Sequence, residues 1–276
     1  MLWKLKTRTL TLTRRPALMA IVNVTPDSFS DGGKFLSTDR AVEHALQLVS
    51  DGADILDIGG ESTRPYSDPV SATEEADRVL PVIEALVRET GIPVSIDTSK
   101  ASVARAAVLA GAEIINDVTG LEGDPEMLTV AVKTGAGICA MHMQGTPQTM
   151  QDDPSYDDVV ADILRYLRQR KEALLAAGID TKKICLDPGI GFGKTHQHNI
   201  ELLNRAETFL ALESPILIGH SRKGFIGKLI DNKESERDSG TLAITILMAT
   251  KGLHIVRIHE VAATRRALDV WQRIQL

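Results

Sequence analysis

The sequence contains little of several residue types, and each shortage excludes a class of protein. Only two of its 276 residues are cysteine, too few for the disulfide framework of a secreted domain. Cys139 and Cys185 each lie in an apolar run, so we expect two reduced core thiols and a cytoplasmic protein. Aromatic residues make up 4%, and the formal net charge is −6. A chain with few stacking rings and no excess of basic residues is not expected to bind nucleic acid.

Long apolar runs are also absent. The longest strongly apolar run, residues 242–249, is far shorter than the roughly 20 residues that a membrane-spanning helix needs. The first fifteen residues scatter basic residues among short apolar alternations and lack the continuous apolar core of a signal peptide. We therefore expect no membrane partner.

Short β-branched apolar runs alternate with stretches of helical periodicity along the whole chain. This pattern is typical of βα units around a parallel sheet, and the runs lack strict alternation because both faces of such strands are covered. No linker or composition break divides the sequence, so we predict one domain over residues 1–276. The predicted strands are residues 17–24, 54–58, 94–96, 113–115, 137–141, 183–186, 215–218 and 254–258.

Residues that start and stop helices lie between these runs. Residues 71–74 match a capping box, and Asp124 precedes a proline as the N-cap of a helix should. Pro81 lies inside a helical stretch, where we expect a kink or a break. Glycines at the predicted helix ends occupy positions that favour left-handed backbone. These glycines are Gly52, Gly91, Gly111, Gly135, Gly178 and Gly252.

Polar residues at the strand ends distinguish a closed barrel from an open, doubly wound sheet. A closed barrel brings all strand ends to one mouth, whereas an open sheet separates half of them from any single cleft. We therefore predict a (β/α)8 TIM barrel, with a short β-hairpin in residues 1–14 that plugs its bottom; the open sheet is the alternative. The strand-end residues are Asn23, Asp57, Glu61, Thr63, Arg64, Asp97, Asn116, Asp117, His142, Asp187, Ser221, Arg222, Lys223, Arg257 and His259.

Three motif-like segments do not carry the chemistry they suggest. The segment that starts at Asp187 has proline where a P-loop requires its first glycine. Ser221 is followed two residues later by lysine rather than the second glycine of a nucleophile elbow, so we do not expect it to be a hydrolase nucleophile. His196 and His198 have no third ligand at a motif-like spacing, and a solvated loop is expected there.

Cationic strand-end residues in a net acidic chain predict a site for an anion. Each is individually compatible with a solvated surface charge, but together they suit phosphate or pyrophosphate. Asn23 adds a neutral oxygen ligand suited to a Mg²⁺ that arrives with the phosphates of a substrate. The predicted cationic set is Arg64, Arg222, Lys223, Arg257 and His259, with His142 as a further candidate.

Asp97, Asn116 and Asp187 are predicted to face the same cavity. Each could instead cap a helix or bond a loop. A carboxylate can accept two parallel N–H bonds from a guanidine-like edge, so the three suit a pterin or purine-like ring. The long loops that follow the first two strands are predicted to be mobile lids, with ordinary βα turns as the alternative.

Eight segments together carry a resemblance to a known family. They are NVTPDSFSDGG (23–33), DIGGESTRP (57–65), IDTSK (96–100), IND (115–117), MHMQGTP (141–147), DPGIGFGK (187–194), SRK (221–223) and RIHEV (257–261). On these segments, which span nearly the whole chain, the sequence resembles the dihydropteroate synthases, the folate-pathway enzymes that sulfonamides target. The resemblance implies a TIM barrel that joins 6-hydroxymethyl-7,8-dihydropterin pyrophosphate to 4-aminobenzoate and releases pyrophosphate. It also implies a cytoplasmic homodimer built through C-terminal helices.

The resemblance implies roles for individual residues. The pterin would be held by Asp97, Asn116, Asp187 and Lys223 and lined by Met141, Phe192 and Gly219. Pyrophosphate would be bound by Asn23, Arg64, Arg257 and His259, with Asn23 also touching Mg²⁺. The 4-aminobenzoate site would be framed by Phe29, Thr63, Pro65, Ser221 and Arg222. The catalytic set would be Asp97, Lys223, Arg257 and His259.

Three residues depart from the family pattern: Glu260 replaces an aspartate, Tyr66 a small residue, and His220 occupies a variable position. None of them is assigned to the chemistry. Three alternative functions stay open at this point. They are a pterin-binding methyltransferase acting on a corrinoid, a Schiff-base aldolase that uses Lys223, and a non-catalytic pterin-binding protein.

Overall fold

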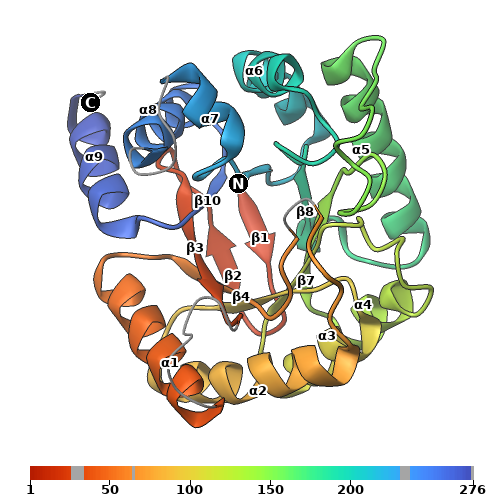
Figure 1. Cartoon of the computed structure of the whole chain (residues 1–276), viewed down its shortest axis with the longest axis vertical. Coiled ribbons are helices and arrows are strands. Elements are labelled where there is room, and N and C mark those ends of the chain that lie inside the picture. The colour runs from red at the N-terminus through yellow and green to blue at the C-terminus, as the bar shows by residue number, and fades with distance from the viewer. Residues whose placement is uncertain (26–33, 64–65, 231–236, 275–276) are drawn as a thin grey trace.

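The computed structural model describes residues 1–25, 34–63, 66–230 and 237–274. Parallel strands surround a central axis, and the helices form an outer ring (Figure 1). In sheet order, the strands run β8-β7-β6-β5-β4-β3-β10-β9, and a bridge between Leu186 and Ile216 joins the two ends. The predicted TIM barrel is therefore confirmed, because an open sheet would leave its edge strands unpaired. The strands are β3 (Ala17–Asn23), β4 (Ile55–Gly59), β5 (Val94–Asp97), β6 (Ile114–Asp117), β7 (Gly137–Met141), β8 (Ile184–Asp187), β9 (Leu217–Ile218) and β10 (Ile255–Ile258).

The helices follow the strands as the βα pattern requires. Among the described residues, no helix is both long enough and apolar enough to cross a membrane. They are α1 (Lys34–Ser50), α2 (Ala72–Glu89), α3 (Ala101–Leu109), α4 (Met127–Thr134), α5 (Val159–Ala176), α6 (His196–Asn204), α7 (Gly224–Leu229), α8 (Arg237–Thr250) and α9 (Val261–Ile274), with short 3₁₀ turns η2 (Thr181–Lys183) and η3 (Ala206–Leu212).

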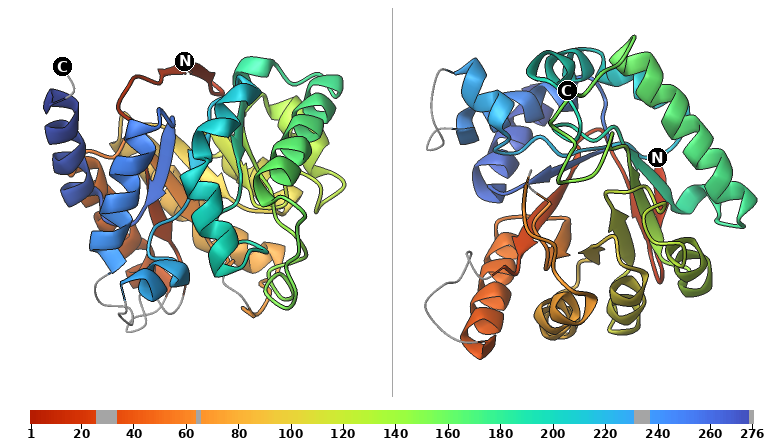
Figure 2. Two further views of the ribbon diagram at one scale, coloured as in Figure 1. Left: turned by 90° about the horizontal axis from the view of Figure 1, so that it is seen from above. Right: turned by 45° about the vertical axis from the view of Figure 1, so that its right-hand side comes forward.

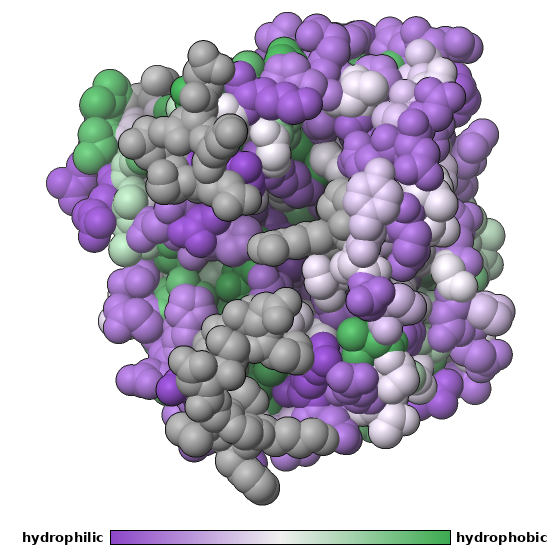
Figure 3. All heavy atoms as spheres, in the orientation of Figure 1, coloured by the Kyte–Doolittle hydropathy of each residue, from purple (hydrophilic) through white to green (hydrophobic). Residues whose placement is uncertain are grey.

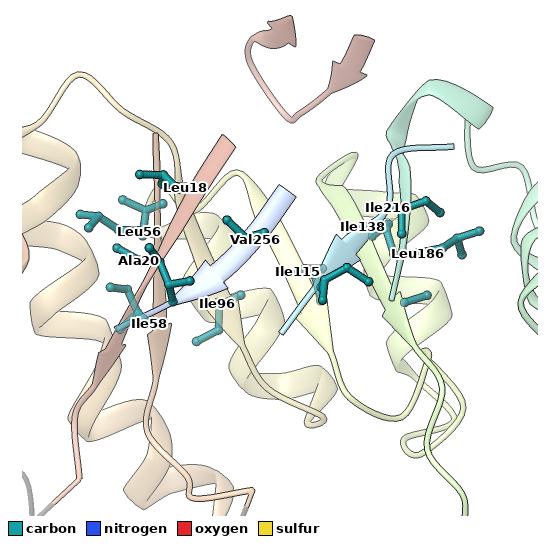
Figure 4. Packing of buried hydrophobic residues seen from close by; sticks show 14 of the residues in the cluster. Leu18, Ala20, Leu56, Ile58, Ile96, Ile115, Ile138, Leu186, Ile216 and Val256 are labelled. Carbon is teal, nitrogen blue, oxygen red and sulfur yellow. The ribbon is translucent and has the colours of Figure 1, made fainter. Parts of the chain in front are cut away.

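Both faces of the strands are buried, which explains their lack of strict alternation. Outward side chains such as Leu56, Ile96 and Val256 pack against the ring of helices in one large cluster (Figure 4). Inward side chains such as Met19 and Ile255 form a second cluster inside the barrel. The face turned toward the viewer in Figure 3 is mostly hydrophilic.

The N-terminal hairpin closes one end of the barrel. Strands β1 (Leu2–Lys4) and β2 (Thr9–Thr11) pair antiparallel, and Trp3 and Leu5 are buried in the inner cluster. The Trp3 indole N–H donates to the carbonyl of Lys183 over 3.0 Å. Figure 2 shows the hairpin at the end opposite to the loop that follows β7. The predicted plug is confirmed, and the mouth at the other end is left for the strand-end residues.

Some local predictions are wrong. Of the six glycines, Gly91 does not adopt left-handed backbone, because Thr90 already leaves α2 in an extended conformation. Helix α2 runs unbroken through Pro81. Helix α4 begins at Met127 rather than directly after Asp124, but Asp124 Oδ1 accepts the Glu126 N–H over 2.9 Å, as the predicted cap would. Its Oδ2 accepts the Ala101 N–H at the start of α3.

Candidate active site at the barrel mouth

The register of the parallel strands places the predicted acidic and amide residues side by side. Asp97 at the end of β5 is paired with Gly59 of β4 on one side and with Asn116 of β6 on the other. Met141 of β7 is paired with Asp187 of β8. Because paired residues in neighbouring parallel strands point to the same side of the sheet, these side chains converge at one rim.

Arg257, in β10, connects two carboxylates from neighbouring strands. Its Nε donates to Asp57 Oδ2 and its Nη2 donates to Asp97 Oδ2, each over 2.6 Å. The same Asp57 oxygen accepts from Asn116 Nδ2 over 3.0 Å. Asp57 is completely buried and therefore fixes the orientation of both Arg257 and Asn116. Asp57 received no role from the sequence, although it begins the DIGGESTRP motif.

These contacts change the ionisation of the groups involved. Burial raises the pKa of Asp97 to about 7, opposed by Arg257 and reinforced by Asp57. Burial alone would lower the pKa of Arg257, but the two carboxylates raise it above its ordinary value. The arginine therefore stays charged, while Asp97 is poised to change protonation near neutral pH.

Asp187 lies beside Gly219 and interacts electrostatically with Lys223. A Cβ built at Gly219 would lie 3.8 Å from Asp187 Oδ2 and 3.9 Å from the Cβ of Arg257. Asp187 and Arg257 thus flank the same point on the rim. Burial raises the pKa of Asp187 to about 6 and lowers the pKa of Lys223 to about 7.

The loop after β8 shapes the surroundings of Lys223. The Lys223 ammonium donates to the carbonyl of Ile190 and lies 4.3 Å from the centroid of the Phe192 ring. Gly191, at φ +83°, lies under the aliphatic stem: a Cβ there would be 2.7 Å from Lys223 Cδ. Only glycine suits this position, because a side chain would displace the lysine.

His142 is not part of the cationic set, so that prediction is wrong. Its Nδ1 lies 3.1 Å from Lys194 Nζ, and burial, with a further contribution from Lys194, lowers the pKa of the imidazole to about 3. The buried Lys194 also donates to the carbonyl of Phe192 over 2.7 Å. Lys194 received no role from the sequence, because within the DPGIGFGK motif it resembles the lysine of a P-loop whose first glycine is missing.

Some of the remaining predicted residues lie within the described part of the chain, and others lie outside it. Ser221 Oγ lies 2.9 Å from His259 Nδ1, which joins the ends of β9 and β10 at the rim. The Arg222 guanidinium forms a two-pronged, exposed ion pair with Asp238 of α8. Thr63 is half-buried in the loop after β4. The predicted residues Phe29, Arg64 and Pro65 lie outside the described residues.

Asn23 lies at the rim, where its amide oxygen can face a cation. A Cβ built at Gly59 would be 3.8 Å from Asn23 Oδ1 and 3.7 Å from Asp97 Oδ2, so the two oxygens border one point. Within the described part of the chain, no three His, Cys, Asp or Glu side chains gather as a metal site. A single amide oxygen fits a Mg²⁺ that keeps its waters and is held mainly by substrate phosphates, rather than a resident ion. The His196 and His198 pair, expected in a loop, instead opens α6, where His198 takes part in a capping box with Thr195.

Comparison with known proteins identifies relatives over nearly the whole chain. Residues 19–259 match the family model described as pterin binding enzyme. The dihydropteroate synthase of Escherichia coli strain K12 is 48% identical over 255 residues, which cover 92% of this chain and 90% of that protein.

Solved structures agree in fold as well as sequence. The Xanthomonas albilineans dihydropteroate synthase with 4-aminobenzoic acid superposes with a TM-score of 0.91 at 48% identity, covering 97% of this chain and 96% of that one. The Yersinia pestis dihydropteroate synthase in a sulfonamide drug complex gives a TM-score of 0.93 at 44% identity, covering 100% and 99%.

Proposed function

This chain belongs to the family of pterin-binding enzymes and, within it, to the dihydropteroate synthases, and from that premise we propose how its own residues share the reaction. The reaction joins 6-hydroxymethyl-7,8-dihydropterin pyrophosphate to 4-aminobenzoate, giving 7,8-dihydropteroate and pyrophosphate. The observation that supports the division of roles is the arrangement of Asp187 and Arg257 on either side of Gly219.

The pterin ring is assigned to the acidic side of the rim. Asp187 accepts two N–H bonds from the guanidine-like edge of the ring, while Asn116 and Lys223 bond a neighbouring ring nitrogen and carbonyl. Asp57 accepts one N–H of the Asn116 amide, which leaves its second N–H and its oxygen to bond the ring. Met141, Phe192 and Gly219 are assigned to line the ring.

The pyrophosphate end is assigned to Arg257, His259 and Asn23, with Arg64 from the segment outside the described residues. Nε and one N–H of Nη2 of Arg257 hold Asp57 and Asp97, so the two N–H groups of Nη1 and the second of Nη2 are left to donate to the diphosphate. Mg²⁺, held by Asn23 and the phosphates, would neutralise negative charge on the leaving group.

The reaction then proceeds without an enzyme nucleophile. The bond between the exocyclic methylene carbon and the diphosphate oxygen breaks, and both electrons leave with pyrophosphate, whose charge the cationic residues stabilise. Asp97 steadies the positive charge left on the pterin methylene. The neutral amine of 4-aminobenzoate, positioned by Thr63, Ser221 and Arg222 together with Phe29 and Pro65, attacks this carbon and loses a proton to solvent or a phosphate oxygen.

A pyrophosphate-release assay tests these roles and separates the alternatives. We expect release from the dihydropterin pyrophosphate that depends on 4-aminobenzoate and on Mg²⁺, and a half-saturating Mg²⁺ concentration that rises in Asn23→Ala. Methyl transfer from a reduced folate to a corrinoid, or borohydride trapping of a carbonyl substrate on Lys223, would support the other enzymes instead. No release at all would leave a non-catalytic pterin-binding protein.

Two further properties belong to the same proposal. We propose a homodimer through the C-terminal helices, supported by the exposed apolar side chains Leu247 of α8 and Val270 and Ile274 of α9. Light scattering during gel filtration tests it, and a monomer at micromolar concentration would refute it. We also propose a cytoplasmic location, which fits the two free buried cysteines, Cys139 and Cys185.

A further inference from the structure

The loop after β4 is tied to the barrel by a lysine that the proposed reaction does not use. Lys100 follows β5 and lies three residues beyond Asp97. Its ammonium donates over 2.6 Å to Glu61 Oε2 and over 2.6 Å to Glu75 Oε2. One cation therefore connects the end of β5, the loop after β4 and helix α2.

This tether is largely removed from solvent. The Glu75 side chain is completely buried, and those of Lys100 and Glu61 are 23% and 19% exposed. A buried carboxylate without a cationic partner is strongly disfavoured, so Glu75 keeps Lys100 in place rather than the reverse. Exposed ion pairs exchange with water, but this one has a fixed geometry.

The start of the loop lies tightly against α2 beside the tether. A Cβ built at Gly60 would lie 2.8 Å from Val79 Cγ1 and 3.1 Å from Glu75 Cγ. Arg78 Nη1 donates to the carbonyl of Gly60 over 2.7 Å. The backbone before Glu61 is thus seated in a groove that only glycine allows, and the ion pairs fix the next residue.

Glu61 also holds the far side of the loop. Its second carboxylate oxygen accepts the backbone N–H of Val70 over 2.8 Å, and Ser67 Oγ donates to the carbonyl of Ser62 over 2.6 Å. The described residues on both flanks of the loop are therefore cross-linked through one carboxylate. Thr63, assigned to the 4-aminobenzoate site, lies two residues from that carboxylate.

We propose that Lys100 is a positioning residue for the second substrate. Through its ion pairs with Glu61 and Glu75 it fixes the backbone before Thr63 relative to helix α2, and thereby the position from which Thr63 contacts 4-aminobenzoate. The inference rests on the proposed function, since it assigns Lys100 to one of the two substrate half-sites. Lys100 makes neither of its two ion pairs with the residues assigned to the pterin. Its link to that half-site is the charge of Glu75, a minor cause of the raised pKa of Asp97, so we expect its main effect in the half-site of the amine.

The test compares the two substrates in one set of variants. Lys100→Met keeps an unbranched side chain, one atom shorter, and removes the charge. We expect the KM for 4-aminobenzoate to rise about 10- to 100-fold, as displacements of about 1 Å can cost. The Kd of the dihydropterin pyrophosphate, titrated without the amine, should change less than twofold. Lys100→Arg, which restores a cation between both carboxylates, should recover most of the loss.

Controls keep the outcome decisive. Glu61→Gln leaves the buried Lys100 and Glu75 pair intact, so it folds if Lys100→Met does not, and it should raise the same KM. Lys251→Met removes a comparable lysine away from the mouth, whose ammonium donates to Glu207 Oε2 over 2.6 Å. It should change neither the KM for 4-aminobenzoate nor the Kd of the dihydropterin pyrophosphate.

Equal losses in KM and Kd, or an unchanged KM in both Lys100→Met and Glu61→Gln, would overturn the proposal. A wild-type enzyme that releases no pyrophosphate with 4-aminobenzoate would instead overturn the proposed function.

Discussion

Replacing Asp187 by asparagine should make the protein more stable and a much weaker pterin binder. Burial raises the pKa of Asp187 from 3.8 to about 6, so the folded state holds a proton in a window where the unfolded chain has lost it. The unfolding free energy of the wild type therefore falls as pH rises from about 4 to about 6, and the penalty persists above that. A shift of about 2 pKa units corresponds to about 3 kcal/mol at most.

Asparagine imitates the protonated carboxyl and escapes this penalty. We expect Asp187→Asn to gain about 1 to 3 kcal/mol of unfolding free energy at pH 8 and little near pH 4. Measurement at pH 8 is favourable because Lys223, with a pKa of about 7, is then mostly neutral and loses little attraction. Urea unfolding at several pH values, analysed by linear extrapolation, gives the difference.

The affinity should change in the opposite direction. Two charge-assisted hydrogen bonds of about 1.5 to 3 kcal/mol each correspond to an affinity loss of about 100- to 10,000-fold. Calorimetric titration with the pterin substrate measures it. A variant that is less stable at pH 8, or an unchanged Kd, would refute the assignment of Asp187 as the buried carboxylate that recognises the ring.

Other substitutions probe separate parts of the structure. His259→Ala should lower turnover about 100-fold while the Kd of the pterin alcohol, which lacks pyrophosphate, changes less than twofold; equal losses in steady-state kinetics and titration would contradict this. Arg257→Ala should likewise impair turnover far more than pterin binding, and it should also lower the unfolding free energy by about 3 to 5 kcal/mol because it strands two buried carboxylates. The exposed ion pair lost in Arg222→Ala should cost less than about 1 kcal/mol in the same urea experiment. Trp3→Ala should cost about 3 to 5 kcal/mol through the cavity it leaves, yet shift neither KM, and a changed KM would show that the hairpin reaches the mouth.

Much of the fold follows from local pattern. The apolar runs gave each strand to within a residue or two, because strands buried on both faces need continuous apolar sequence. Pro81 was misleading for a physical reason: it lies on the exposed face of α2, while Val79, Val82 and Ile83 are buried against the barrel. On that face, water can satisfy the carbonyl that proline leaves unbonded, so packing maintains the helix.

The site was predictable only in outline. Strand ends converge in any barrel, which brought Asp97, Asn116 and Asp187 together. Sequence could not show that Asp57 would hold Arg257, or that Lys194 would leave His142 neutral, because both depend on burial and on partners far away in the chain. Counting charges in the sequence treats every basic residue as a free cation, whereas here several basic side chains already donate hydrogen bonds to carboxylates or carbonyls.

The hairpin plug also has a consequence for biosynthesis. Trp3 leaves the ribosome well before Lys183, whose carbonyl receives its indole and which lies 180 residues later. The floor of the barrel cannot be completed until Lys183 has been translated, and until then the indole has no partner for its N–H. Nascent chains truncated before η2 should consequently depend on chaperones more than longer ones.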